Sequence, residues 1–299
     1  MIVQHNMAAL NTNRQLGATN STLAKSTEKL SSGYRINRAG DDAAGLSISE
    51  KMRGQIRGLE QGSTNAQDGI SLIQTAEGAL NEVHAVLQRM RELAVQGAND
   101  TNVAEDREAI TKEMTALKDE IGRIGASTEY NTMKLLDGSF VESDKFLQVG
   151  ANKNGDTTIG DDGVGEQVIK LKMVTITAEG DITSADGETE ASLADAIPEV
   201  ADEDMNEAFQ TSIGTIDDAI KAVSSSRSDL GAIQNRLEHT IANADNTAEN
   251  LQAAESRIRD VNMAEEMVKY SKSSILQQAG QSMLAQANQQ TQGVLSLLR

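Results

Sequence analysis

The side chains that most often perform catalysis are few in this sequence and are not arranged for it. The three histidines, His5, His84 and His239, lie far apart and show no metal-ligand spacing. Cysteine is absent, which excludes disulfides, thiolate metal sites and cysteine nucleophiles. The 45 Asp and Glu residues include no pair marked out for acid–base catalysis. The sequence therefore predicts a protein that is not an enzyme and needs no cofactor or metal.

Two short segments have the composition of ligand-binding loops. Residues 160–165, Gly-Asp-Asp-Gly-Val-Gly, resemble a phosphate loop but lack its Lys-Ser/Thr ending, and no helix with apolar periodicity follows them. Residues 152–156 offer oxygen ligands but lack the bidentate Glu and the full spacing of a calcium loop. Both segments are better interpreted as turns.

A third candidate is the charged cluster Arg89, Arg91 and Glu92. Charges at helical spacing usually pair with their neighbours on a solvated face, where each pair contributes only tenths of a kcal/mol, on the order of 0.3. Spacing alone therefore favours ordinary surface charges for this cluster.

The composition indicates long helices and limits the possible partners. The 299 residues allow about two domains, aromatic residues are only 2%, and Pro198 is the single proline. A net charge of -18 argues against nucleic acid or an anionic membrane as a partner. Eleven acidic residues and no Lys or Arg lie between Thr177 and Glu207. No run approaches the roughly 18 apolar residues of a membrane span, and the start lacks the pattern of a secretory signal.

Apolar periodicity predicts the elements that must position any surface. Heptad spacing runs from Met52 to Ala94 and again from Phe209 to Ile258, which predicts two long helical rods. A shorter helix is expected from Ile110 to Ile124. The two chain ends, residues 7–30 and 263–299, have sparse apolar positions, so we expect them to order only by packing together or against other copies.

The middle of the chain is expected to form short strands. Residues 140–141, 146–149 and 157–159 are short runs of β-favouring residues between turns. Residues 168–177 alternate between apolar and basic side chains, as in a half-exposed strand. The acidic segment that follows is predicted to be a solvated loop or a small surface appendage.

Several segments of the chain are distinctive. They are MIVQHNMAALNTNRQL at the start, STEKLSSGYRINRAGDDAAGLSISEKMRGQIRGL from Ser26, LQRMRELAVQ from Leu87, YNTMKLLDGSF from Tyr130, FLQVGAN from Phe146, RSDLGAIQNRLEHTI from Arg227 and SILQQAGQSMLAQANQQTQGVLSLLR from Ser274. In this order along the chain, the segments resemble bacterial flagellin. The resemblance covers residues 1 to about 155 and about 207 to 299.

The resemblance implies a mainly α fold of long antiparallel rods and coiled-coil-like terminal helices, with a β-hairpin and a small acidic insertion. Residues 1–42 and 261–299 would be the halves of an inner-core helical domain, residues 43–160 and 207–260 the halves of an outer-core domain, and residues 161–206 a variable surface insertion. The expected inner-core packing residues are Leu10, Leu16, Leu23, Leu30, Ile275, Leu284, Val294, Leu295 and Leu298.

The resemblance also implies function and partners. The chain would self-assemble into an open helical homopolymer, the extracellular filament used for swimming. It would meet the flagellar type III export apparatus, a flagellin chaperone, the filament cap and hook–filament junction proteins. Host Toll-like receptor 5 would recognise the monomer, and the residues implied at this receptor and subunit interface are Gln88, Arg89, Glu92, Leu93, Gln96 and Glu113.

Two other function classes stay open at this stage. A coiled-coil interaction or signalling protein could use the same heptads in a discrete oligomer. An enzyme carried on the insertion is nearly excluded, because residues 160–206 contain no His or Cys and are too few for an independent core.

Overall fold

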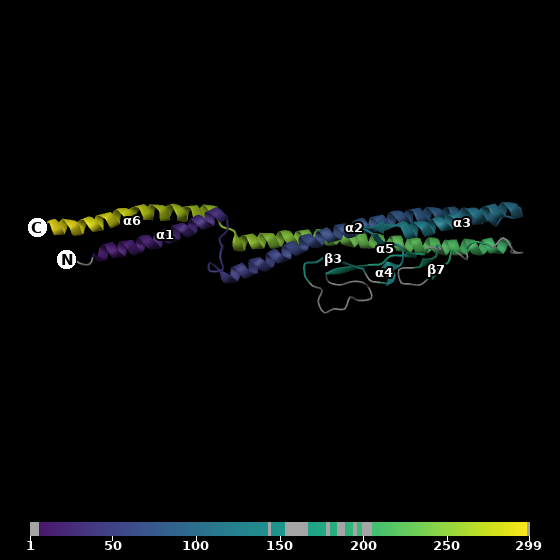
Figure 1. The fold of residues 1–299 in the computed structure, drawn as a ribbon, viewed down its shortest axis with the longest axis horizontal. Coiled ribbons are helices and arrows are strands. Elements are labelled where there is room, and N and C mark those ends of the chain that lie inside the picture. The colour runs from purple at the N-terminus through teal and green to yellow at the C-terminus, as the bar shows by residue number, and fades with distance from the viewer. Residues whose placement is uncertain are drawn as a thin grey trace. The chain divides into compact units, whose positions relative to one another are not determined.

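The computed structural model describes residues 6–142, 145–152, 167–177, 180–183, 189–193, 196–198 and 205–297, and most of them are helical (Figure 1). The chain divides into two compact units. Unit 1 contains residues 1–54 and 249–299, and unit 2 contains residues 55–248. The helices α2 (Ala43–Gly97) and α5 (Met205–Arg259) each contribute residues to both units.

Unit 1 is built on the two terminal helices, α1 (Met7–Ser32) and α6 (Met263–Leu297), which lie side by side (Figure 1). The side chain of Asn6 caps α1 by accepting a hydrogen bond from the Ala9 N–H at 3.0 Å. Gly33, with a φ of 76°, ends α1 in the left-handed conformation that glycine adopts without strain. The expected helices at the two chain ends are therefore confirmed.

Unit 2 is organised around α2, α5 and α3 (Ala104–Ser127). Their buried faces follow the predicted heptads: Ile73, Leu80 and Leu87 of α2 are 0% exposed, and so are Ile216 and Leu237 of α5. Helix α3 adds Ile110, Met114 and Ile121 to the same core. The heptad faces thus bury one another along unit 2, as expected from their period.

Short strands cover part of this helical core. Strands β1 (Glu129–Tyr130) and β2 (Met133–Lys134) form a hairpin, and β3 (Lys145–Gln148) pairs antiparallel with β4 (Val168–Leu171), with Phe146 opposite Lys170. A three-stranded antiparallel sheet follows, in the order β5 (Thr175–Ile176), β6 (Ile182–Thr183) and β7 (Thr189–Ala191).

The β3–β4 pair sits close to α2 because α2 presents glycines there. A Cβ added to Gly62 would lie 2.5 Å from the carbonyl oxygen of Val149, and one added to Gly69 would lie 2.3 Å from Leu147 Cδ1. Between these glycines, the side-chain amide of Asn65 donates to the Gln148 carbonyl at 2.9 Å. Because these glycines have no Cβ, the strand backbone can approach the helix closely.

The middle of the chain differs from the sequence prediction in two places. Residues 140–141 belong to a short helix, α4 (Ser139–Glu142), because the Asp137 carboxylate accepts from the Ser139 N–H at 3.0 Å and starts a helical turn. The expected strand 168–177 is divided into β4 and β5. The expected strand at 157–159 lies outside the described residues.

The acidic segment is also more than a solvated loop. Ile182, Leu193 and Ala196 are each 0% exposed and join the core of unit 2. Burial of these few apolar side chains holds their part of the segment in that core. Of the two predicted forms, a solvated loop or a small surface appendage, these residues therefore fit the appendage, which packs on the core.

Candidate functional site

The terminal helices of unit 1 expose a large share of their apolar surface. Of the fourteen large apolar residues that stand exposed in the described part of the chain, eight belong to α1 or α6. They are Met7, Leu10, Met263, Met267, Val268, Ile275, Leu276 and Met283, and their exposed fractions range from 48% to 68%. So many exposed large apolar side chains on one pair of helices indicate an interaction surface.

Few of the described side chains in the seam between α1 and α6 are fully buried. Leu16, Leu23, Leu30 and Leu284, which were expected to pack in the inner core, are half-buried. The residues most buried along this seam are polar: Ser26, Ser273 and Glu266. Leu16, Leu276 and Met283 line an open groove of about 570 Å³ between the two helices.

The other expected packing residues are not enclosed by this chain or are not described. Leu10 and Ile275 are each 66% exposed. Val294 and Leu295 lie in α6, where their side chains are not described, and Leu298 lies outside the described residues.

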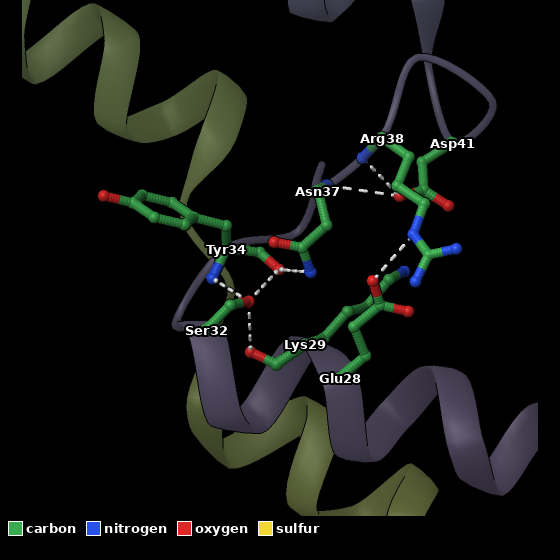
Figure 2. A network of polar contacts seen from close by, with 7 residues as sticks. All are labelled: Glu28, Lys29, Ser32, Tyr34, Asn37, Arg38 and Asp41. Atoms are coloured by element: carbon green, nitrogen blue, oxygen red, sulfur yellow. Dashed lines mark hydrogen bonds and ion pairs between the residues drawn. The ribbon is translucent and has the colours of Figure 1, made fainter.

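A polar network fixes the chain where it leaves α1 (Figure 2). The Asp41 carboxylate accepts hydrogen bonds from the backbone N–H groups of Arg38 at 3.1 Å and Asn37 at 3.2 Å. The two hydrogen bonds favour the ionised carboxylate and so lower the pKa of Asp41, and the bond from Arg38 has the larger effect. The Arg38 side chain in turn reaches Glu28 of α1 at 3.0 Å. The turn is thereby tied to the helix before it.

The same segment is bound to the end of α5 within unit 1. The Arg35 N–H donates to the Arg259 carbonyl at 2.7 Å, and Tyr34 forms a β-bridge with Asp260. The Arg259 guanidinium lies 4.8 Å from the centre of the Tyr34 ring, a cation–π distance. The Tyr34 N–H is held by the hydroxyl of Ser32 at 3.1 Å (Figure 2). The segment following α1 is therefore held through both backbone and side chains.

This junction network was missed by sequence reasoning. The turn-forming residues of NRAGDD, from Asn37 to Asp42, were the signal that could have indicated an ordered turn. Its partners on α5 could not be inferred, because they lie more than 200 positions away.

On unit 2, the expected receptor-interface residues form an exposed charged cluster between α2 and α3. The Arg89 guanidinium contacts Glu113 of α3 at 3.0 Å and Glu92 of α2 at 3.1 Å. The Glu113 hydrogen bond, followed by that of Glu92, raises the pKa of Arg89. Gln88 and Gln96 are exposed on the same helix. We call Gln88, Arg89, Glu92, Gln96 and Glu113 the Arg89 surface.

Leu93, expected at the same interface, is only 2% exposed. Its side chain packs in the core of unit 2 together with Met90 and Ala94. Leu93 is therefore not accessible in the single chain, which corrects the expectation that it shares the Arg89 surface.

The other chemical candidates remain isolated. His84 is half-buried in α2, His239 is exposed in α5, and His5 lies outside the described residues. Within the described ranges, no group of three or more His, Asp and Glu is placed to hold a metal ion. Nor does any described helix combine the length and apolar character needed to cross a membrane.

Comparison with known proteins identifies the family. Residues 3–141 match the bacterial flagellin N-terminal helical region, and residues 213–298 match the bacterial flagellin C-terminal helical region. A flagellin of Halalkalibacterium halodurans is 54% identical, and the flagellar filament 33 kDa core protein of Treponema phagedenis is 50% identical, each over the full length of both chains. The crystal structure of Bacillus cereus flagellin is 30% identical, covers 64% of this chain and 94% of its own, and has a TM-score of 0.43. The two family regions together span most of the chain, which belongs to the bacterial flagellin family.

Proposed function

We propose that the exposed apolar faces of α1 and α6 are the surfaces through which this flagellin polymerises into the filament. A flagellin is a structural subunit, so its function lies in contacts between copies. Those contacts join different patches on successive copies and do not close into a ring, which gives an open helical homopolymer. The expected division into inner-core and outer-core domains accords with this arrangement and stays a prediction.

The observation that carries the proposal is the unfinished core of unit 1. Unit 2 encloses side chains such as Leu80 and Phe209 completely, whereas Ile275 and Val268 of α6 are 66% and 68% exposed. Burying the exposed part of one such side chain is worth about 1–2 kcal/mol. The eight exposed apolar residues of α1 and α6 therefore provide a driving force for association, because their burial is not completed in the monomer.

Substitution of Ile275 tests the proposal. The full-length chain would be incubated in precipitating salt and imaged by electron microscopy, as wild type, as Ile275→Asp and as Ile275→Leu. Ile275→Asp should not form filaments, while its monomer unfolds at the wild-type temperature, because residue 275 is largely exposed in the single chain. Ile275→Leu keeps the apolar face and should polymerise. Normal filaments from Ile275→Asp would contradict the role of this face.

Truncation of α6 distinguishes a filament subunit from a coiled-coil protein that forms a discrete oligomer. Removing residues 280–299 shortens α6 without touching unit 2. A filament subunit should then lose polymerisation while circular dichroism still reports helical rods. An unchanged oligomeric state in analytical ultracentrifugation would instead support the coiled-coil alternative.

We further propose that the chain is secreted through the flagellar type III export apparatus and assembles outside the cell. A flagellin chaperone, the filament cap and the hook–filament junction proteins would be its partners on this route. Membership of the flagellin family supports this assignment. The chain should collect in the medium of a host with a working export apparatus, and export from a host that lacks the apparatus would contradict it.

A second proposed role is recognition of the monomer by Toll-like receptor 5 at the Arg89 surface. Its support is geometric: α2 and α3 bring Arg89, Glu92 and Glu113 together with side chains 48% to 69% exposed. An Arg held by two carboxylates is fixed in direction, and such preorganised Arg residues are common binding hot spots.

The receptor test uses a matched arginine on the same unit. Arg89→Ala should weaken binding of the monomer to the receptor ectodomain about tenfold or more, the range of an interface hot spot. Arg123→Ala is the control, because Arg123 is also exposed and paired, to Glu120 at 2.5 Å, but lies outside the Arg89 surface. Unchanged affinity for Arg89→Ala would sink this role and leave polymerisation untouched.

A further inference from the structure

Half of the exposed apolar side chains on the terminal helices are methionines. Four of the eight such residues of α1 and α6 carry a thioether, and their exposed fractions range from 48% to 66%. They are Met7 of α1 and Met263, Met267 and Met283 of α6. We call these four residues the methionine set.

Other methionines are enclosed in the core of unit 2. Met90 and Met114 are 0% exposed, and Met173 is 1% exposed. A dissolved oxidant must collide with the sulfur atom to react with it, so these buried thioethers are protected in the folded chain. The fold therefore directs sulfur oxidation toward the terminal helices.

Met283 shows where a new polar group would fall within unit 1. It lines the open groove of about 570 Å³ between α1 and α6, together with Leu16 and Leu276. The two helices approach closely there, because a Cβ added to Gly280 would lie 3.2 Å from Leu16 Cδ1. An oxygen atom on the Met283 sulfur would thus be placed in a groove lined by apolar side chains.

We propose that the methionine set is a modification site at which a hydroperoxide reversibly inhibits assembly. The sulfur takes one oxygen atom from hydrogen peroxide: the O–O bond breaks, an S–O bond forms, the sulfur gives up two electrons, and the reduced peroxide leaves as water. The flexible apolar thioether becomes a polar, chiral sulfoxide. A methionine sulfoxide reductase reverses the step, because its two thiols form a disulfide as the oxygen leaves as water.

The effect on assembly rests on the proposed polymerisation through the faces of α1 and α6. A sulfoxide in such a contact must lose its bound water when the next copy covers it, which costs free energy unless a hydrogen-bond donor replaces that water. Oxidation of the methionine set should therefore weaken association and leave the enclosed core of unit 2 intact.

Peptide mass spectrometry of the full-length monomer, treated with dilute hydrogen peroxide, tests the site without reference to assembly. Each member of the methionine set should gain one oxygen atom at least about tenfold faster than Met90 and Met114. Equal rates for the two groups would overturn the site, whether or not the chain polymerises.

The consequence is tested by the critical concentration for polymerisation. Peroxide should raise it about tenfold or more for wild type, and treatment with methionine sulfoxide reductase should restore it. Leucine conserves the volume and apolar character of methionine, so a variant with leucine throughout the methionine set should polymerise like untreated wild type before and after peroxide. This variant carries Met7→Leu, Met263→Leu, Met267→Leu and Met283→Leu.

Met133→Leu is the matched control. Met133 is also exposed, at 43%, but lies in β2 of unit 2, so the control should stay sensitive to peroxide. An unchanged critical concentration for oxidised wild type, or continued sensitivity of the fourfold variant, would overturn the proposal. Failure of untreated wild type to polymerise would instead overturn the proposed polymerisation, so the two failures are distinguishable.

Discussion

Alanine at Gly62 should destabilise unit 2 although alanine is the better helix former. The new Cβ would lie 2.5 Å from the carbonyl oxygen and 2.8 Å from the carbonyl carbon of Val149, where ordinary contact begins at 3.4 Å. The strand must retreat by roughly 0.9 Å, which strains the bond from Asn65 to the Gln148 carbonyl. Overpacking of this kind costs about 1–3 kcal/mol, against about 0.5–1 kcal/mol gained in helix propensity.

Gly78 of the same helix provides the control. A Cβ at Gly78 meets nothing within 4 Å, so Gly78→Ala should stabilise by about 0.5–1 kcal/mol through propensity alone. The two free energies of unfolding would be measured by urea denaturation followed by circular dichroism, below the concentration at which the chain polymerises. Propensity cancels between the variants, which leaves a steric difference of about 1–3 kcal/mol. Equal stabilisation by both variants would refute the close contact between α2 and the strand.

Two further perturbations have predictable outcomes. Phe209 is 0% exposed and lies against Gly97. Phe209→Ala should therefore lower the free energy of unfolding of unit 2, measured by the same denaturation, by about 3–5 kcal/mol. A loss below about 1 kcal/mol would contradict the packing of Phe209. The pKa of Asp41 is lower in the folded chain than its ordinary value of 3.8, so its ionised form stabilises the junction above that value and the stabilisation is lost as the pH falls through the folded pKa. Amide exchange at Asn37 and Arg38, corrected for its intrinsic pH dependence, should therefore lose protection below pH 3.8 in wild type, and Asp41→Asn should abolish that transition.

The long helices could be predicted from sequence because their signal is local and repeated. Each heptad position in α2 and α5 carries the same information as the next, so Ile73, Leu80 and Leu87 identify one buried face without knowledge of the partner. The terminal helices were likewise identified from their sparse apolar positions. Their exposed residues, such as Ile275, agree with the expectation that this chain alone does not complete their packing.

The middle of the chain and the junction could not be predicted in the same way. Phe140 has high strand propensity, yet the side chain of Asp137 starts a helical turn that buries it. The partners that hold Arg35 lie on α5, more than 200 positions along the chain. Leu93 was placed at an interface by resemblance, whereas its burial follows from the apolar face of α2. The junction depends on contacts distant in sequence and α4 on a single local side-chain hydrogen bond, and apolar periodicity reports neither.

The most direct test of the central claim is amide hydrogen exchange of the full-length chain, measured by mass spectrometry before and after polymerisation in salt. If other copies complete the packing of α1 and α6, their amides should exchange rapidly in the monomer and become strongly protected in the polymer. The buried segments of α2 and α5 in unit 2 should be protected in both states. Equal protection of α1 and α6 in monomer and polymer would contradict the account, because it would mean that the terminal helices complete their fold without a neighbour.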